Sequence, residues 1–337
     1  MSSSDIPQPH DGIVRLAFSE LPQAISFFQE YLPAPVVEAL DWDSLTLLDG
    51  TFVDEDLRQA ETDRLYSIPF IEKDGETRIL LYILFEHQSS EDDWMPVRLL
   101  FYMCCIWKRW RSQHSIKDGL PLILPFVLSH APGGWRVTRQ FHDLFRWPKS
   151  EALREILKQY IPLFEYELLD LKGTDLEALR GGPFVRVLLG VLKTASEGDP
   201  RKFLGWAVLL MVSPPFMAVN QTVREALYLY MFKVAELNPE EFRATVDEIP
   251  LTGEQTKAIM SLADYLKQEG LEEGLEKGRR EGRQEGRQEG LLIGQVQMLQ
   301  QLLGRPVESF DNLNLHSNEQ LESMLAGLQR EVRAQMK

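Results

Sequence analysis

Three consecutive polar residues, Glu86, His87 and Gln88, end the apolar stretch LLYILF and are of types that could do chemistry. The side chains of a strand alternate between its two faces, so Glu86 and Gln88 are expected on one face and His87 on the other. Asp63 lies upstream, and the Asp-Gly pair at 74–75 is typical of a hairpin turn. Pairing across that turn would place residue 63 opposite residue 86. The spacing therefore predicts two carboxylates, with an amide beside them, at one end of a sheet.

Two carboxylates placed so closely repel each other unless a cation neutralises them. Oxygen ligands favour a hard dication, Mg²⁺ or Mn²⁺. Such an ion can polarise a phosphoryl oxygen and lower the pKa of a bound water. Asp63 and Glu86 are therefore candidate ligands of a hard divalent metal ion.

The elements that must position these residues follow from apolar periodicity. A helix is expected over 11–31 with a break at Pro22, and a second helix after Ser90, with Lys108, Arg109 and Arg111 near its C-terminus. The apolar face of the second helix comprises Met95, Leu99, Tyr102, Met103, Ile106 and Trp110. Strands are expected at 44–54, 62–70, 78–86 and 120–130. The order helix, strand, strand, strand, helix, strand predicts an α/β core with a mixed sheet.

Composition excludes several classes of protein. The chain has 337 residues, 44% of them hydrophobic, and a net charge of −15, which is not that of a general nucleic-acid coat protein. The N-terminus lacks the pattern of a signal peptide, and the apolar run at 203–219 is broken by Pro214, so no membrane span is expected. Cys104 and Cys105 are adjacent and match no disulfide framework or zinc spacing, which suits a cytoplasmic protein.

The C-terminal half has a different character. From about 151 to 265 the patterns are helical and strand signals vanish. The expected domains are the α/β core domain at 1–150, a helical extension at 151–265, a Gly/Glu-repeat helix or linker at 266–300 and a small helical domain at 301–337. In the last domain Ser317 and Gln320 form a capping-box pattern.

The repeat has a glycine every four residues from Gly270 to Gly294, among Glu, Arg and Gln. Each glycine costs a helix about 1 kcal/mol relative to alanine, so a flexible linker is one interpretation. The other, which we favour, is a conditional helix whose glycine stripe lets a second helix lie closely against it, giving a homo-oligomer. The stretch KGRREGRQEGR at 277–287 is strongly basic and is a second candidate for DNA contact.

Five segments together resemble the Rpn (recombination-promoting nuclease) family of bacteria, within the PD-(D/E)XK nuclease superfamily. They cover roughly residues 9–150 and read HDGIVRLAFSE, FFQEYLP, LLDGTFVDEDLRQAETDRLY, LLYILFEHQSSEDDWMPVRLLFYM and LPLILPFVLSHAPGGW. The resemblance implies a PD-(D/E)XK core of order α-β-β-β-α-β, followed by an all-α C-terminal half. It also implies metal-dependent hydrolysis of DNA.

Carried over residue by residue, the resemblance makes Asp63 the motif aspartate and Glu86 the second acidic ligand. The backbone carbonyl of His87 is then a further candidate metal ligand, and Gln88 takes the position of the superfamily's lysine. Thr62 stands where the superfamily has proline, which matters little. Glutamine for lysine matters more, since an amide cannot balance charge on the phosphate as an ammonium would, although it can still orient a water.

Several further residues keep two interpretations. Arg98 could reach a phosphate or could be a solvated arginine. His10 and Asp11 could form the rim of the site, although Asp11 is more simply a helix cap. His130 is more typical of a structural or turn histidine than of a base. An acidic residue from the first helices could join the site, and the candidates are Glu20, Glu30 and Glu38.

The leading hypothesis is a cytoplasmic Mg²⁺-dependent DNA endonuclease that promotes recombination. Asp63 and Glu86 would hold the metal, Gln88 would position the attacking water, and the C-terminal half would oligomerise the protein. The alternative is a catalytically inactive, oligomeric DNA-associated or assembly protein that keeps the nuclease fold. Residues 1–150 carry 14 Lys and Arg against 22 Asp and Glu, so activity is expected to depend steeply on salt and Mg²⁺.

Overall fold

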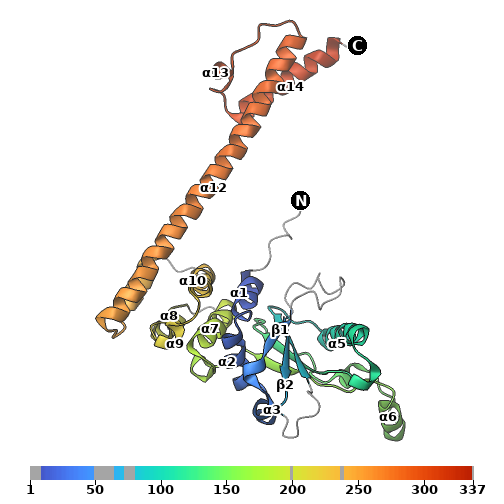
Figure 1. The fold of residues 1–337 in the computed structure, drawn as a ribbon. Helices are drawn as coiled ribbons and strands as arrows, with labels where there is room; N and C mark the ends of the chain where they lie inside the picture. Colours follow the sequence, from blue (N-terminus) through green and yellow to red (C-terminus); the bar gives the residue numbers. More distant parts are fainter. Residues whose placement is uncertain (1–8, 49–63, 72–79, 198–199, 236–238, 336–337) are drawn as a thin grey trace. The chain divides into compact units, whose positions relative to one another are not determined.

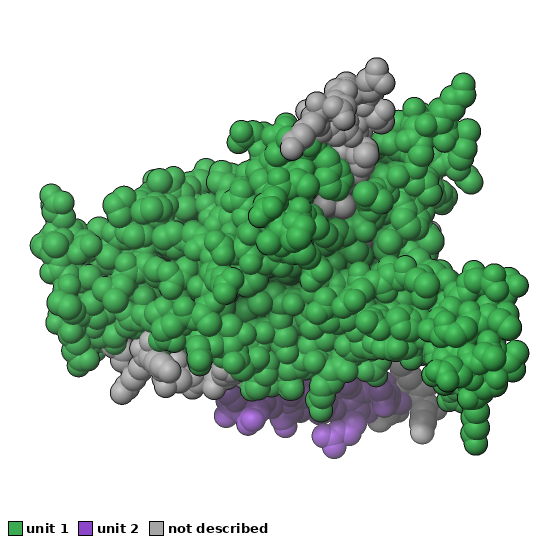
Figure 2. Space-filling model, turned by 90° about the horizontal axis from the view of Figure 1, so that it is seen from below, with its two compact units in different colours: residues 1–263 green, residues 264–337 purple. Residues whose placement is uncertain are grey.

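The structure, a computed structural model, describes residues 9–48, 64–71, 80–197, 200–235 and 239–335 (Figure 1). The chain divides into two compact units, residues 1–263 and 264–337, which Figure 2 colours separately. None of the helices in the described part of the chain is both long and apolar enough to cross a membrane.

The first unit is built on one five-stranded sheet. Its strands are β1 (Thr46–Leu48), β2 (Arg64–Pro69), β3 (Leu80–Gln88), β4 (Leu122–Ser129) and β5 (Glu167–Asp170), in that spatial order. β2 pairs antiparallel with both β1 and β3, whereas β3, β4 and β5 are parallel. The mixed sheet is confirmed, with β3 in its middle.

β5 corrects the expectation that strand structure ends before residue 151. It is only four residues long, YELLDL around it shows no alternation of apolar and polar residues, and its residues are all half-buried. Its pairing with β4 stabilises it, and that pairing leaves no local sequence signal. The sheet therefore extends beyond the segment that the sequence assigned to it.

The register between β2 and β3 has the offset that the sequence predicts. Arg64 lies opposite Phe85, and Pro69 lies opposite Leu80. Asp63 and the Asp-Gly pair at 74–75 lie outside the described residues, so their predicted pairing stays a prediction.

Helices cover both faces of the sheet (Figure 1). α1 (Pro9–Ala17) and α2 (Leu21–Tyr31) lie on one face and are separated at the predicted break, since Pro22 occupies the first turn of α2. Phe27 and Phe28 of α2 contact the rings of Phe85 and Phe126 on the central strands.

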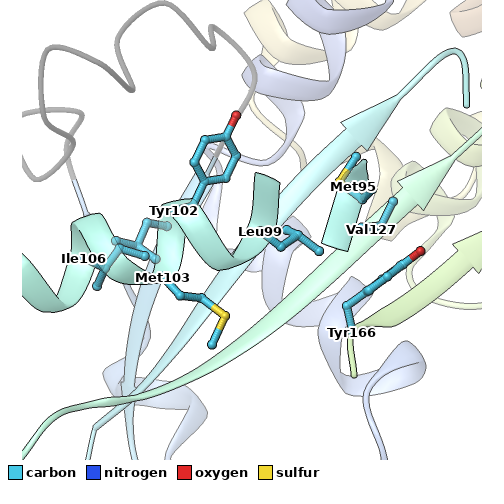
Figure 3. Close-up of a cluster of buried hydrophobic side chains, with 8 residues drawn as sticks. Met95, Leu99, Tyr102, Met103, Ile106, Val127 and Tyr166 are labelled. Atoms are coloured by element: carbon cyan, nitrogen blue, oxygen red, sulfur yellow. The ribbon is translucent and has the colours of Figure 1, made fainter. Parts of the chain in front are cut away.

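α5 (Met95–Gln113) covers the opposite face. Figure 3 shows its apolar side directed at Val127 of β4 and at Tyr166, which precedes β5. The buried residues of α5 in this cluster are Met95, Leu99, Tyr102, Met103 and Ile106, as the periodicity predicts, with Trp110 partly buried beside them. Removing apolar surface from water contributes roughly 25 cal/mol per Å² to the free energy of folding, so the burial of these side chains stabilises the domain.

The remaining elements of the first unit are helical. They are α3 (Ala34–Ala39), α6 (Glu151–Lys158), α7 (Pro183–Glu197), α8 (Pro200–Met211), α9 (Pro214–Met217), α10 (Gln221–Ala235) and α11 (Pro239–Asp247). The apolar run at 203–219 divides between α8 and α9 at the predicted proline. α10 packs against both α1 and α7, so residues from far along the chain reach the first helix.

α12 (Gly253–Leu302) is a continuous helix through the glycine repeat. The close approach of a second helix to the glycine stripe stays a prediction. A Cβ atom added at Gly286, Gly290 or Gly294 would have no atom from another part of the chain within 4 Å, so the surface of α12 is open at these three glycines. In the second unit, α13 (Phe310–Leu313) and α14 (Asn318–Gln335) follow. Their shared core comprises Ile293, Val296, Leu313, Leu321 and Leu328. The predicted capping box at 317–320 is confirmed by reciprocal hydrogen bonds.

Candidate active site at the end of strand β3

Glu86 is a buried carboxylate, with 1% of its surface exposed, near the C-terminal end of β3. Its side chain points to the α5 face of the sheet, where Arg98 Nη2 donates a short hydrogen bond to Oε1. The same oxygen accepts a second bond from Gln88 Nε2 at 2.8 Å. A buried carboxylate needs such compensation, because burial without a partner is costly. Arg98 and Gln88 therefore hold Glu86 in one position.

Gln88 lies on the same face as Glu86, as the strand alternation predicts. Its amide nitrogen bonds both Glu86 Oε1 and the backbone carbonyl of His87, each at 2.8 Å. Its side-chain oxygen is an acceptor and can bind a proton of water. The amide thus joins two of the three groups that the sequence proposed as metal ligands, Glu86 and the His87 carbonyl.

Arg98 is anchored by two carboxylates rather than solvated. Its Nη1 lies 3.0 Å from Asp92 Oδ2, while Nη2 binds Glu86. Asp92 also accepts the backbone N–H of Trp94, through Oδ1 at 2.9 Å. The loop between β3 and α5 is therefore tied directly to the Glu86 carboxylate.

His87 points to the other face, towards α1. Its Nδ1 lies 3.2 Å from Asp11 Oδ1, and its ring stacks on that of His130 at a centroid distance of 4.9 Å and an interplanar angle of 13°. His130 follows β4, and its backbone N–H donates to the carbonyl of Gln88 at 3.0 Å. Asp11 therefore joins the histidine side of the sheet and not the Glu86 side.

Two more residues extend this buried cluster. The ring of His10 lies 4.9 Å from that of His130, and its Nδ1 makes a short hydrogen bond with the hydroxyl of Tyr230 on α10. Burial, together with the neighbouring His87 and His10, lowers the pKa of His130 to about 3. The pKa of His10 is also lowered, mainly by burial, and that of Tyr230 is raised by burial. These groups are therefore neutral at pH 7 and form a structural network.

Glu86 retains one feature that suits a cation. Its Oε2 is buried and has no hydrogen-bond partner among the described residues. An unpartnered buried carboxylate oxygen is what a dication would satisfy. The described residues hold no group of three or more His, Cys, Asp and Glu side chains that could bind a metal ion, and Asp63 lies outside them. Among the described residues, the Glu86 side chain is therefore the one carboxylate of the site that suits a divalent cation.

The structure thus brings Glu86, His87, Gln88 and Arg98 together. Sequence reasoning missed Asp92 as the second partner of Arg98; its position six residues after Glu86, in the connecting loop, was the available signal. It also missed the cluster formed by His10, His130 and Tyr230, whose members are too far apart along the chain to form a motif.

Comparison with known proteins gives a consistent picture. A family model described as "Putative transposase, YhgA-like" matches residues 8–215, more than half of the chain. The chain is 34% identical over 130 residues to the recombination-promoting nuclease RpnD of Escherichia coli O157:H7, covering 39% of this chain and 48% of RpnD. It is 25% identical over 266 residues to the recombination-promoting nuclease RpnC of Escherichia coli K12, covering 78% and 82% of the two chains.

The relatives are not uniform. The chain is also 23% identical over 275 residues to the inactive recombination-promoting nuclease-like protein RpnE of Escherichia coli K12, covering 80% of this chain and 85% of RpnE. Against RpnD and the related RpnA, the match spans about half of the relative's length. No solved structure matches the chain.

Proposed function

Because the chain belongs to the family described as "Putative transposase, YhgA-like", we propose that it is a DNA endonuclease that uses Mg²⁺ or Mn²⁺ and promotes recombination. The relatives named recombination-promoting nucleases support the reaction class. In this proposal the sheet and its flanking helices are a PD-(D/E)XK core. DNA is the partner, and the reduced Cys104 and Cys105 suit a cytoplasmic location.

The observation that carries the proposal is the state of Glu86. A buried carboxylate on a central strand has one oxygen held by Arg98 and Gln88, while the other has no partner among the described residues. Glu86, the carbonyl of His87 and Asp63 would hold the ion, which would polarise the scissile phosphate and lower the pKa of a bound water.

The side chains of the protein have separate tasks in this scheme. Gln88 orients the attacking water through its amide oxygen and keeps the His87 carbonyl in place through its nitrogen. Arg98 fixes the conformation of the Glu86 carboxylate and keeps a positive charge beside it.

The first experiment measures cleavage of supercoiled plasmid with Mg²⁺, with Mn²⁺ and with EDTA. We expect wild-type cleavage to require the dication and Glu86→Gln to lower the rate at least about 100-fold, since a metal ion contributes several kcal/mol in such transition states. Asp63→Ala should have a similar effect. Equal cleavage by the wild type and both variants would indicate a contaminating nuclease and remove the assignment.

A catalytically inactive, DNA-associated protein is the second candidate. The guanidinium of Arg98 already neutralises Glu86, and RpnE is named inactive. Binding of DNA without cleavage in either metal would favour this function.

We also propose self-association through the C-terminal half, in which the glycines of α12 would let two helices approach closely. Light scattering measures the number of chains per particle. We expect this number to be larger for the full-length protein than for a chain truncated after residue 265. The same state for both would refute this role.

A further inference from the structure

The outer side of α5 combines exposed aromatic rings with positive charge. Trp94, the residue before α5, is 68% exposed, and Phe101 is 48% exposed. Lys108, another seven residues along, is also exposed. Residues seven apart lie nearly two helical turns apart and on the same side of a helix. Trp94, Phe101 and Lys108 therefore form one line, called here the α5 stripe.

The charge of α5 is opposite to that of the chain. Besides Arg98, which is paired with Glu86 and Asp92, the helix carries Lys108, Arg109 and Arg111 and no acidic residue, whereas the whole chain has a net charge of −15. Cys105, Lys108, Arg109 and Ser112 line a pocket of about 230 Å³ on this helix. A basic helix in an acidic protein is a favoured place for a polyanion to bind.

Two of the three acidic residues in the loop before α5, Glu91 and Asp92, are paired with arginines, whereas Asp93 is exposed. Glu91 accepts hydrogen bonds from the backbone and guanidinium of Arg136, at 2.6 and 3.3 Å. Asp92 is paired with Arg98. The acidic loop before α5 therefore repels a phosphate chain less than its sequence indicates.

The stripe begins at the candidate active site. The backbone of Trp94 is bonded to Asp92, Asp92 to Arg98, and Arg98 to Glu86. The backbone of Trp94 is thus linked to the Glu86 carboxylate through Asp92 and Arg98. A nucleic acid held at Glu86 would lie beside the N-terminal part of the stripe.

We propose that the α5 stripe binds a single-stranded segment of the DNA substrate, with Trp94 stacking on an unpaired base. The proposal rests on the proposed nuclease function. In a duplex both faces of each base are covered by its neighbours, so an exposed indole can stack only on a base that has left the helix. Aromatic rings interleaved with positive charges are typical of single-strand binding surfaces. The preferred substrate is then DNA with single-stranded or branched segments.

The test measures binding of the full-length protein by fluorescence anisotropy, in EDTA to prevent cleavage. The probes are a labelled 20-nucleotide single strand and the duplex of the same sequence. The α5 stripe is about 21 Å long, or about six nucleotides at B-form spacing, so the probe exceeds it. The variants are Trp94→Ala, Trp94→Phe and, as a matched control, Tyr160→Ala, which removes a 73% exposed ring beyond α6.

We expect Trp94→Ala to weaken single-strand binding about 5- to 100-fold, the range for loss of one base–aromatic stack, and duplex binding less than about twofold. Trp94→Phe should retain most of the affinity, and Tyr160→Ala should match the wild type. Trp94 is exposed, so its removal should not prevent folding, which circular dichroism would confirm.

Unchanged single-strand binding by Trp94→Ala would overturn the proposal, as would an equal loss on both probes. A change in oligomeric state of Trp94→Ala by light scattering, without loss of DNA binding, would show that the stripe binds protein instead. A wild-type protein that binds neither probe would overturn the proposed function as well. If the wild type shows metal-dependent cleavage and Trp94→Ala binds the single strand as tightly as the wild type, this inference fails and the proposed function stands.

Discussion

The two faces of β3 near its end differ in almost every property although neighbouring residues build them. On the α5 face, Glu86 and Arg98 are ionised groups joined to Asp92 and Gln88, and one carboxylate oxygen has no partner among the described residues. On the α1 face, the rings of His87, His130 and His10 lie against one another, with the carboxylate of Asp11 beside His87. Strand alternation alone separates them.

The difference shows how one strand can serve two purposes. Contacts between rings hold α1, β4 and α10 together on the α1 face. The charged face cannot be optimised for stability in the same way, since a buried ion pair is costly to desolvate and is retained mainly where a charge is needed. The α5 face is therefore where chemistry is expected, and the α1 face is where stability is expected.

The largest effect on stability should come from Arg98→Ala. It leaves Glu86 buried without its cation, and we expect the free energy of unfolding to fall by about 2 to 3 kcal/mol, less than for a fully buried pair because Arg98 is partly exposed. Urea denaturation measures it. Arg136→Ala, which removes a solvent-exposed ion pair with Glu91, is the matched control and should cost less than about 1 kcal/mol.

Millimolar Mg²⁺ should recover part of the stability of Arg98→Ala, because a dication can replace the guanidinium beside Glu86. The double variant Arg98→Met with Glu86→Gln should also recover part of it. Wild-type stability in Arg98→Ala would show that Glu86 does not depend on this partner.

The next effect belongs to the α1 face and depends on pH. The pKa of His130 is about 3 in the folded protein, against 6.5 for an ordinary histidine, so the unfolded chain binds the extra proton between these values. Stability should therefore fall as pH falls below 6.5, by about 1.4 kcal/mol between pH 7.5 and 5.5 from this residue. The lowered pKa of His10 acts in the same direction.

Urea denaturation at the two pH values measures this loss. His130→Leu should remove most of the difference and leave metal-dependent cleavage largely unchanged. His114→Gln replaces an exposed histidine and is the control. It should lose as much free energy of unfolding between the two pH values as the wild type. The same pH dependence in His130→Leu would mean that other groups cause it.

The smallest effect should come from Asp11→Ala, which removes the hydrogen bond to His87. The carboxylate is partly exposed, so we expect a loss of about 1 kcal/mol in the free energy of unfolding. Asp11→Asn keeps an acceptor and should lose less. A fall in cleavage as large as that of Glu86→Gln would show that the two faces do not divide their roles as described.

Much of the fold could be predicted because local pattern and tertiary position agree. The apolar residues of α5 recur at helical spacing and are buried where that spacing places them. The strand 122–129 and the break before α2 carry equally direct signals. β5 could not be predicted, because a four-residue strand is stabilised by its pairing rather than by its own residues.

The site was predictable to the same extent. Glu86, His87 and Gln88 are consecutive, and their alternation follows from the strand alone. That Arg98 binds Glu86 depends on the angle at which α5 crosses the sheet, which no pattern encodes. His10, His130 and Tyr230 meet only after the whole first unit has folded, since 220 positions separate His10 from Tyr230.

The separation of the two faces has an evolutionary consequence. If the chain is the nuclease proposed above, a substitution on the α5 face would remove catalysis while the aromatic and histidine contacts that maintain the fold stay intact. Selection for the scaffold and selection for the reaction can then act independently on alternate positions of one strand. A lineage with this arrangement can lose its activity in a single step and still inherit a stable protein, which accords with the presence of a relative named inactive beside others named nucleases.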